Sequence, residues 1–275
     1  MSEEFNQLTD SRHGRMIYNR NDMYIGRSLE VYGEFSHGEA VIFKQIVQPG
    51  FFVIEAGANI GAHTVVLAKR AGAQGRVLAF EPQRIVFQTM CGNVALNNLR
   101  NVYTYNAGLG EESGELVVPD LDPTSENNFG GLGLGDYTRG LPVPIHTIDS
   151  FDLPRCDFIK ADVEGMEENV LRGGEETIIK FQPTLYIEND REDKAPSLVG
   201  YIRSLGYRIY FHSPFLYNEN NFRKNADNIY PGVVSKNILC VHESRGGTIK
   251  GLPEYVPAEV AEARRKEKQA AELSR

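Results

Sequence analysis

The sequence predicts an α/β fold in which a mostly parallel sheet carries helices on both faces, the doubly wound arrangement. From residue 51 to residue 188, short apolar runs alternate with segments of helical pattern, which is typical of parallel strands joined by crossover helices. The first run, residues 51–55, is continuous and β-prone, and a glycine-containing turn and a helix follow it. The chain has 275 residues, of which 41% are hydrophobic and 24% charged, enough for one such domain with additions.

Seven short apolar runs are the expected strands. They are residues 51–55, 76–81, 102–106, 157–161, 184–188, 207–210 and 237–241. Helical patterns lie between them, at residues 60–70, at 83–97, in a segment ending near residue 171, and at 197–205. Asn97 and Asn98 are the expected stop of the second of these helices.

The chain is expected to have a core domain, two flanking parts and two inserted segments. Residues 1–50 form an N-terminal cover, residues 51–245 the ligand-binding domain, and residues 246–275 a C-terminal tail that should be a solvated helix. The glycine-rich loop 119–141 and the polar, aromatic segment 211–236 interrupt the alternation, and we expect both to cover a binding site.

Composition excludes some classes of function. The formal net charge is -8, which argues against a protein that grips a nucleic-acid backbone. No run of about 18 apolar residues predicts a membrane span, and the polar N-terminus lacks a signal-peptide core, so a cytoplasmic location is expected. Cys91, Cys156 and Cys240 have no spacing typical of zinc ligands and are expected to be buried thiols.

The turn after the first strand carries the ligand signal. Glu55 is followed by Gly57, Asn59 and Gly61 where the strand gives way to a helix. A dinucleotide site would have a middle glycine at position 59, and the acidic Glu55 suits a cationic ligand better than a diphosphate. S-adenosylmethionine fits both facts, with its carboxylate at the free N–H groups of the helix start and its amine toward Glu55.

The second strand ends in another acidic residue. Glu81 is placed to accept hydrogen bonds from both ribose hydroxyls, and Pro82 fixes the turn that aims it.

Several segments together resemble the FkbM family of methyltransferases. The resemblance rests on residues 53–64 (VIEAGANIGAHT), 79–82 (AFEP), 157–174, 183–188 and 32–39. It implies a class I methyltransferase fold with seven strands and an antiparallel last strand. It also implies S-adenosylmethionine as donor, S-adenosylhomocysteine as product, and methylation, usually on oxygen, of a sugar, polyketide or other small metabolite. The family more often has Asp where this chain has Glu55, and a larger residue than Ala161.

The acceptor side should lie at the ends of the fourth and fifth strands. Methyl transfer from a sulfonium needs alignment, and an alcohol acceptor also needs a base. Asp162 directly follows the fourth strand and is the first candidate for that base or for an anchor; it also belongs to the expected cofactor site. Glu164 is a second catalytic candidate, and Lys160 would orient these acids. The competing interpretation makes Asp162 a helix N-cap with Glu164 in the first helical turn.

A histidine upstream is a further catalytic candidate. Ser36 and Glu39 have the spacing of a capping box that opens a helix. His37 stands at this helix start and titrates near neutral pH in its ordinary range. We therefore include it among the catalytic candidates.

A metal is the less favoured alternative. Asp162, Glu188 and Asn189 supply oxygen ligands at two strand ends, which would suit Mg²⁺ as in catechol-type methyltransferases. No metal ligand is assigned on this spacing.

Three other functions compete with a small-molecule O-methyltransferase. They are an N-methyltransferase of amides or peptides, a non-catalytic cofactor-binding module and a nicotinamide oxidoreductase. The partner expected from the leading interpretation is a small-molecule or glycan acceptor, with no nucleic acid, and a homodimer is kept open as the assembly.

Overall fold

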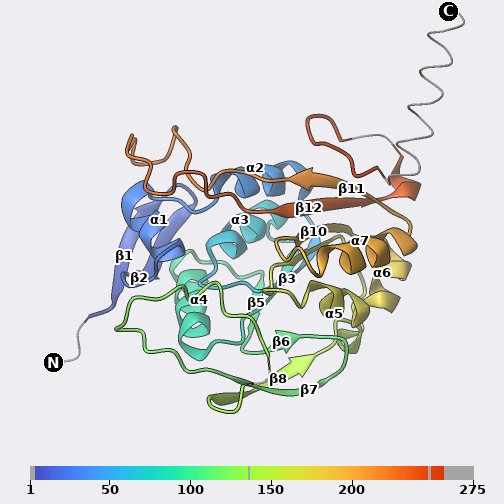
Figure 1. The fold of residues 1–275 in the computed structure, drawn as a ribbon, viewed down its shortest axis with the longest axis horizontal. Helices are drawn as coiled ribbons and strands as arrows, with labels where there is room; N and C mark the ends of the chain where they lie inside the picture. The colour runs from blue at the N-terminus through green and yellow to red at the C-terminus, as the bar shows by residue number, and fades with distance from the viewer. Residues whose placement is uncertain (1–3, 136, 247–248, 257–275) are drawn as a thin grey trace, which may run out of the picture.

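A seven-stranded sheet forms the centre of the computed structural model, which describes residues 4–135, 137–246 and 249–256 (Figure 1). Its strand order is β11-β12-β10-β9-β3-β4-β5. The strands are β3 (Phe52–Ala56), β4 (Arg76–Phe80), β5 (Val102–Tyr105), β9 (Phe158–Ala161), β10 (Thr184–Glu188), β11 (Tyr207–His212) and β12 (Asn237–His242). Neighbours are parallel except at β12, which is antiparallel to β10 and β11. The predicted fold class, with its antiparallel last strand, is confirmed.

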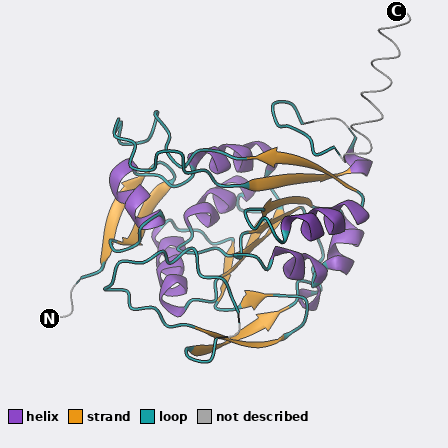
Figure 2. Ribbon diagram, viewed as in Figure 1, coloured by secondary structure: helices purple, strands orange, loops and turns teal. Residues whose placement is uncertain are grey.

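Helices cover both faces of this sheet (Figure 2). On one face lie α2 (His37–Ile46), α3 (Ala62–Ala71) and α4 (Arg84–Leu96), and on the other α5 (Glu167–Arg172), α6 (Glu175–Phe181) and α7 (Ala195–Ser204). Val53 packs toward the first set and Ile54 toward the second, since successive strand residues point to opposite faces. Both faces are buried, which is why β3 is a continuous apolar run.

A second, three-stranded sheet was not predicted. It has the order β6-β8-β7, formed by β6 (Gly108–Leu109), β7 (Gly114–Val118) and β8 (Leu141–His146). Pro142 and Pro144 argue against a strand in the sequence. They are accommodated because β6 pairs only with Ile145 and His146, which leaves that edge of β8 unpaired at the two prolines. Two short 3-10 helices, Asp149–Phe151 and Glu243–Arg245, complete the elements.

The first 50 residues contain a hairpin and two helices. The hairpin is β1 (Asn6–Ser11) with β2 (Gly14–Asn19), and α1 (Ile25–Tyr32) follows it. Asn93 of α4 holds the hairpin: its side chain donates to the Ile17 carbonyl at 2.9 Å and accepts from the Ile17 N–H at 2.6 Å. The fully buried amide thus acts as an extra backbone pairing at the edge of β2.

The segment between β11 and β12 packs on this N-terminal part. The Tyr230 hydroxyl donates to the Met23 carbonyl at 2.7 Å, and the Tyr230 ring lies against Tyr24 and Tyr32. Buried Glu34 accepts from the Asn218 amide at 2.8 Å and from the Phe222 N–H at 2.9 Å, and also pairs with Arg12. Two segments about 180 residues apart in the chain are therefore joined by buried polar contacts.

Residues 257–275, most of the tail expected to be helical, lie outside the described residues. Among the described helices, none combines the length and apolar character needed to cross a bilayer.

Candidate active site

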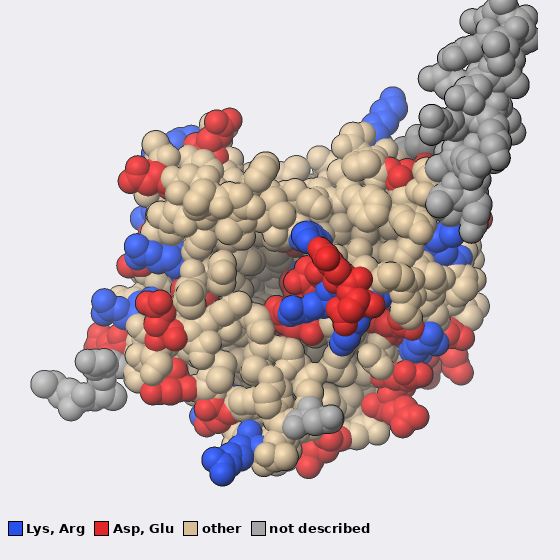
Figure 3. All heavy atoms as spheres, viewed as in Figure 1, with Lys and Arg blue, Asp and Glu red and all other residues tan. Residues whose placement is uncertain are grey.

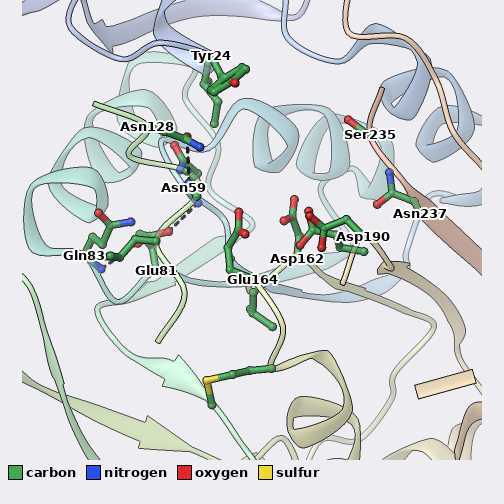
Figure 4. A pocket seen from close by; sticks show the side chains of 18 of the residues that line it. Tyr24, Asn59, Glu81, Gln83, Asn128, Asp162, Glu164, Asp190, Ser235 and Asn237 are labelled. Carbon is green, nitrogen blue, oxygen red and sulfur yellow. Dashed lines mark hydrogen bonds between the residues drawn. The ribbon is translucent and has the colours of Figure 1, made fainter. Parts of the chain in front are cut away.

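A cavity of about 310 Å³ opens at the carboxyl ends of β3, β4, β9 and β10. The space-filling view shows a hollow in this face, with acidic and basic side chains gathered along one side of it (Figure 3). Figure 4 shows two groups of polar side chains facing each other across it. Asn59, Glu81, Gln83 and Asn128 lie on one side, Asp162, Asp190, Ser235 and Asn237 on the other, and Glu164 between them. We call these sides the glycine-turn half and the β12 half of the cavity.

The turn after β3 is built around left-handed backbone. Gly57 has φ +74°, and a Cβ there would lie 1.8 Å from the Asp162 carbonyl oxygen, so only glycine fits. Gly61 has φ +83° and precedes α3, where a Cβ would meet Met90 of α4 at 3.2 Å. Gly57 thus lets β3 and the end of β9 approach, and Gly61 lets two helices approach.

The N–H groups of residues 57–61 are occupied, so this part of the turn does not supply the free amides that the sequence predicts at the helix start. Gly57 and Ala58 donate to the Phe80 carbonyl at 3.1 and 2.9 Å, and Asn59 donates to Glu81 Oε2 at 2.9 Å. Ile60 donates to the Asn59 side chain and Gly61 to the Ala58 carbonyl. The turn therefore braces the end of β4 and does not offer its own amides to an anion.

Glu81 is the central acid of the glycine-turn half. It is 3% exposed, lines the cavity, and accepts the N–H groups of Asn59 and Gln83, the latter at 2.8 Å. Burial raises its pKa to about 7, against those two hydrogen bonds. Each carboxylate oxygen keeps acceptor capacity for hydroxyl donors. Pro82 also lines the cavity, and the Asn106 amide fixes the turn by donating to the carbonyls of Glu81 and Pro82.

The glycine-rich loop forms a wall of this half. Gln83 donates from its side chain to the Phe129 carbonyl at 2.7 Å, and Asn128, Gly130 and Gly131 line the cavity beyond it. Asn128 and Gly130 lie beside Asn59, whereas Leu132 and Leu134 line the cavity on either side of Gly133, which approaches Glu164.

The other predicted cover, residues 211–236, lines the β12 half, but not with its aromatic rings. Leu216, Val233, Val234 and Ser235 reach the cavity. Phe215 and Phe222 are 63% and 45% exposed, and the other rings of this segment are absent from the described lining. The part of this segment that lines the cavity is therefore aliphatic and polar, and not aromatic.

Three carboxylates meet where the two halves join. Oxygens of Asp162, Glu164 and Glu188 all lie within 4.8 Å of one another. Burial, then the neighbouring Asp162, raises the pKa of Glu164 to about 7 and that of Glu188 to about 10. Arg191 pairs with Glu164 on the outer side. Such a cluster has the oxygen ligands that a divalent cation uses, and Asn189, the other residue of the Mg²⁺ alternative, has a buried Oδ1 with no partner among the described residues.

Asp162 is not a helix N-cap. Helix α5 begins five residues later, at Glu167, and Glu167 itself accepts the N–H groups of Val163 and Gly165, each at 3.0 Å. The competing interpretation of Asp162 as a cap is therefore wrong, and its side chain is left free to face the cavity.

Lys160, buried behind the cavity wall, forms an ion pair with Asp162. Its Nζ lies 3.1 Å from Asp162 Oδ2, and the side chain is 2% exposed. Burial alone would lower the pKa of Lys160, but the carboxylates of Asp162, Glu55 and Glu39 raise it. Lys160 does not line the cavity, so it acts on a ligand through Asp162.

Glu55 also lies behind the cavity wall. It pairs in register with Lys160 across β3 and β9, is fully buried, and accepts from the Thr64 hydroxyl at 2.6 Å. Burial raises its pKa to about 7. It supports Lys160 and does not itself reach the cavity.

Glu39 is a cavity residue that the sequence pattern concealed. Helix α2 begins at His37 as expected, but Ser36 makes no backbone cap, and its hydroxyl donates to Glu39 Oε1 at 2.7 Å. Glu39 is 3% exposed and lines the cavity, as Asp162 does. Burial raises the pKa of Glu39, and the charge of nearby Lys160 lowers it. Its position on the apolar side of α2, with Ala40 and Phe43, was the available signal.

His37 lies away from the cavity lining. It stacks on His13 with ring centroids 5.7 Å apart, and burial lowers its pKa. Buried His63, beside Lys160, has a pKa lowered to about 3 and is neutral. Neither histidine is placed to take a proton from a ligand in the cavity.

Comparisons with known proteins show which family the chain resembles. The Methyltransferase FkbM domain model matches residues 55–209. "Methyltransferase 1" of Beauveria bassiana (strain ARSEF 2860) is 30% identical over 177 residues, 55% of this chain and 71% of that protein. "Methyltransferase sdnD" of Sordaria araneosa is 31% identical over 160 residues, 46% of this chain and 61% of that protein.

Among solved structures, the crystal structure of methyltransferase FkbM from Methylobacillus flagellatus KT is similar, with 19% identity and a TM-score of 0.48. The match covers 73% of this chain and 50% of that one.

The family match covers more than half of the chain and includes the glycine turn, Glu81 and the carboxylate cluster. The chain therefore belongs to the FkbM methyltransferase family and is an S-adenosylmethionine-dependent methyltransferase.

Proposed function

We propose that this enzyme transfers the methyl group to a hydroxyl oxygen of a small molecule or glycan, with residues 51–245 as the catalytic domain and residues 1–50 as its cover. The single observation that carries the proposal is the position of Asp162, which faces the cavity between the two halves and is held by Lys160 at 3.1 Å.

S-adenosylmethionine binds in the glycine-turn half in this proposal. Glu81 accepts the ribose hydroxyls, while Gly57, Asn59, Gly61 and Pro82 keep Glu81 in place through the contacts of the turn. Glu55 acts through Lys160. The surplus of carboxylates over free cations at this cavity suits a sulfonium donor electrostatically.

The transfer step is a displacement at the methyl carbon. The acceptor oxygen forms the new bond to carbon, the bond from carbon to sulfur breaks, and its electron pair stays on sulfur to give S-adenosylhomocysteine. Asp162 takes the hydroxyl proton, and Lys160 keeps that carboxylate oriented. Glu164 lies beside it as the second acid.

Asp162→Asn tests the assignment. We expect S-adenosylhomocysteine to bind with near wild-type affinity by calorimetry, while turnover falls by about 10²–10⁴-fold, because the proton acceptor is lost. Asp193→Asn, which changes an exposed carboxylate on the loop after β10, is the matched control and should keep wild-type turnover.

Turnover is measured with labelled donor on a panel of alcohols, sugars and amides, and NMR locates the methyl group. Full activity of Asp162→Asn removes Asp162 as the base. Methyl on nitrogen selects the N-methyltransferase, and donor binding without transfer selects a non-catalytic module.

Metal independence is a second expected outcome. Lys160 already neutralises Asp162, so we expect turnover to survive EDTA and not to rise with added Mg²⁺. Loss of activity with EDTA and its return with Mg²⁺ would instead assign Asp162, Glu164 and Glu188 to a bound cation.

A further inference from the structure

Glu188 and Asn237 form a pair that joins the carboxylate cluster to the β12 half of the cavity. Glu188 ends β10, Asn237 begins β12, and the two are directly opposite in the antiparallel register. Directly opposite residues present their side chains on the same face of a sheet. Both residues line the cavity.

Each member of the pair has a buried polar atom that no described residue satisfies. Asn237 is 5% exposed, and its Nδ2 has no hydrogen-bond partner. Glu188 Oε2 is equally shielded and equally without a partner. Buried polar groups are nearly always hydrogen-bonded, so these two atoms point to a ligand that completes them.

The position of the pair assigns that ligand to the acceptor and not to the donor. In Figure 4, Asn237 and Ser235 lie across the cavity from Asn59, Glu81 and Gln83, with Asp162 nearer the middle. A nucleoside held by Glu81 leaves the β12 half for the second substrate.

The chemistry of the pair selects an uncharged oxygen. An amide N–H only donates, so the unpartnered Nδ2 of Asn237 needs an acceptor atom on the ligand. The neighbouring wall combines apolar Leu216, Val233 and Val234 with Ser235, Lys236 and Asp190. A hydroxyl oxygen can accept from Asn237 and donate to Glu188 Oε2, and a carbonyl oxygen can accept from Asn237, whereas an ammonium group cannot accept from Asn237.

We propose that Glu188 and Asn237 hold a second, uncharged oxygen of the methyl acceptor beside the reacting hydroxyl at Asp162. This rests on the proposed O-methyl transfer. Carboxylate oxygens of Glu188 and Asp162 lie within 4.8 Å, which matches two oxygens on adjacent carbons, each bound by one carboxyl group. The acceptor is therefore a vicinal diol or a hydroxy carbonyl compound.

The test measures binding to the enzyme loaded with S-adenosylhomocysteine, with trans-1,2-cyclohexanediol and cyclohexanol as probes. We expect wild type to bind the diol about tenfold more tightly than the mono-alcohol, the effect of one good hydrogen bond. Asn237→Leu should remove that preference, and Asn237→Asp, which keeps the shape, should also remove it. Asn220→Leu, an exposed asparagine in the preceding segment, is the control and should keep it.

Equal affinity of wild type for the two probes, or no binding of either, overturns the inference, as does a preference that survives in Asn237→Asp. The same variants separate it from the proposed function. If Asp162→Asn stops methylation of the diol while Asn237→Asp keeps the preference for the diol, Asp162 is the base but Glu188 and Asn237 do not bind the second oxygen. If wild type prefers the diol but methylates only nitrogen compounds, the subsite stands and O-methylation falls.

Discussion

At the scale of single residues, the active site places several buried acids around one buried lysine. Glu55 and Asp162 both face Lys160, and Glu39 lies beside them. Lys160 is the only buried lysine or arginine among the described residues, so these acids share its charge. Ionisation of Glu55, which is fully buried, should therefore lower the free energy of unfolding.

Glu55→Gln tests this as a stability prediction. Burial raises the folded-state pKa of Glu55 from 4.5 to about 7, so the folded protein favours the protonated acid. The contribution of Glu55 is fully present below pH 4.5 and is lost as pH rises through about 7. We expect the stability of wild type relative to Glu55→Gln to fall by about 3 kcal/mol from pH 4.5 to pH 8, at 1.36 kcal/mol per unit. Urea denaturation at several pH values measures it, and a constant difference would contradict the shift.

Glu81→Gln tests the donor half at the same scale. Gln keeps the shape of Glu but has an NH2 group in place of one carboxylate oxygen. That group can only donate, so one acceptor of hydrogen bonds is lost. We expect the affinity for S-adenosylhomocysteine to fall by about 10- to 100-fold, because hydrogen bonds to a charged group are each worth about 1.5–3 kcal/mol. Calorimetry decides it; undiminished affinity would remove Glu81 from the cofactor site.

At the scale of elements, the turn after β3 packs closely against the end of β9. This contact fixes the position of Glu81 relative to Asp162. Gly57→Ala brings a methyl group to 1.8 Å from the Asp162 carbonyl. We expect this variant to lose most of its S-adenosylhomocysteine affinity and turnover, because both Glu81 and Asp162 must shift. Gly72→Ala is the matched control, since Gly72 has a similar φ of +67° with nothing within 4 Å of its Cβ. It should cost only the backbone strain, about 1–3 kcal/mol, and leave binding intact.

Elements with a local signature were predictable. The strands of the central sheet are continuous apolar runs, and the glycines at 57 and 61 mark the turn. Elements without one were not: β6 has two residues, and Pro142 and Pro144 break the strand pattern of β8. The same holds for Glu39, because Ser36 and Glu39 have capping-box spacing, whereas their tertiary neighbours make them a buried pair.

Contacts of the turn were also beyond the sequence. The glycine pattern predicts a bend at residue 57, but it does not say that the Phe80 carbonyl accepts two of its N–H groups. Nor does a ring-rich segment reveal that Tyr230 packs on Tyr24 and Tyr32 while Phe215 faces outward. Direction of a side chain depends on residues far away in the chain, and no local period encodes it.

At the scale of the whole molecule, Glu34 links the N-terminal part to the segment between β11 and β12. Glu34→Ala removes the acceptor of the Asn218 and Phe222 donors and one of the two partners of Arg12, which also donates to the Asn220 carbonyl. We expect a loss of about 2–4 kcal/mol in the stability of this contact, because a buried charge partner is removed. Amide exchange at residues 216–233 should accelerate, while exchange in β3 and β9 stays slow; uniform acceleration would mean that the contact is part of the global fold.

The link between these two segments has a consequence for engineering new specificity. Residues 213–236 contribute lining residues to the β12 half of the cavity, where we propose that the acceptor binds, and they pack on the first 35 residues through Glu34, Tyr24 and Tyr32. A chimera that imports only residues 213–236 from a related enzyme would pack that segment against N-terminal residues that do not match it. Exchange of the amino-terminal hairpin and first helix together with that insertion, as one cassette, should retain a folded donor half and redirect the choice of substrate.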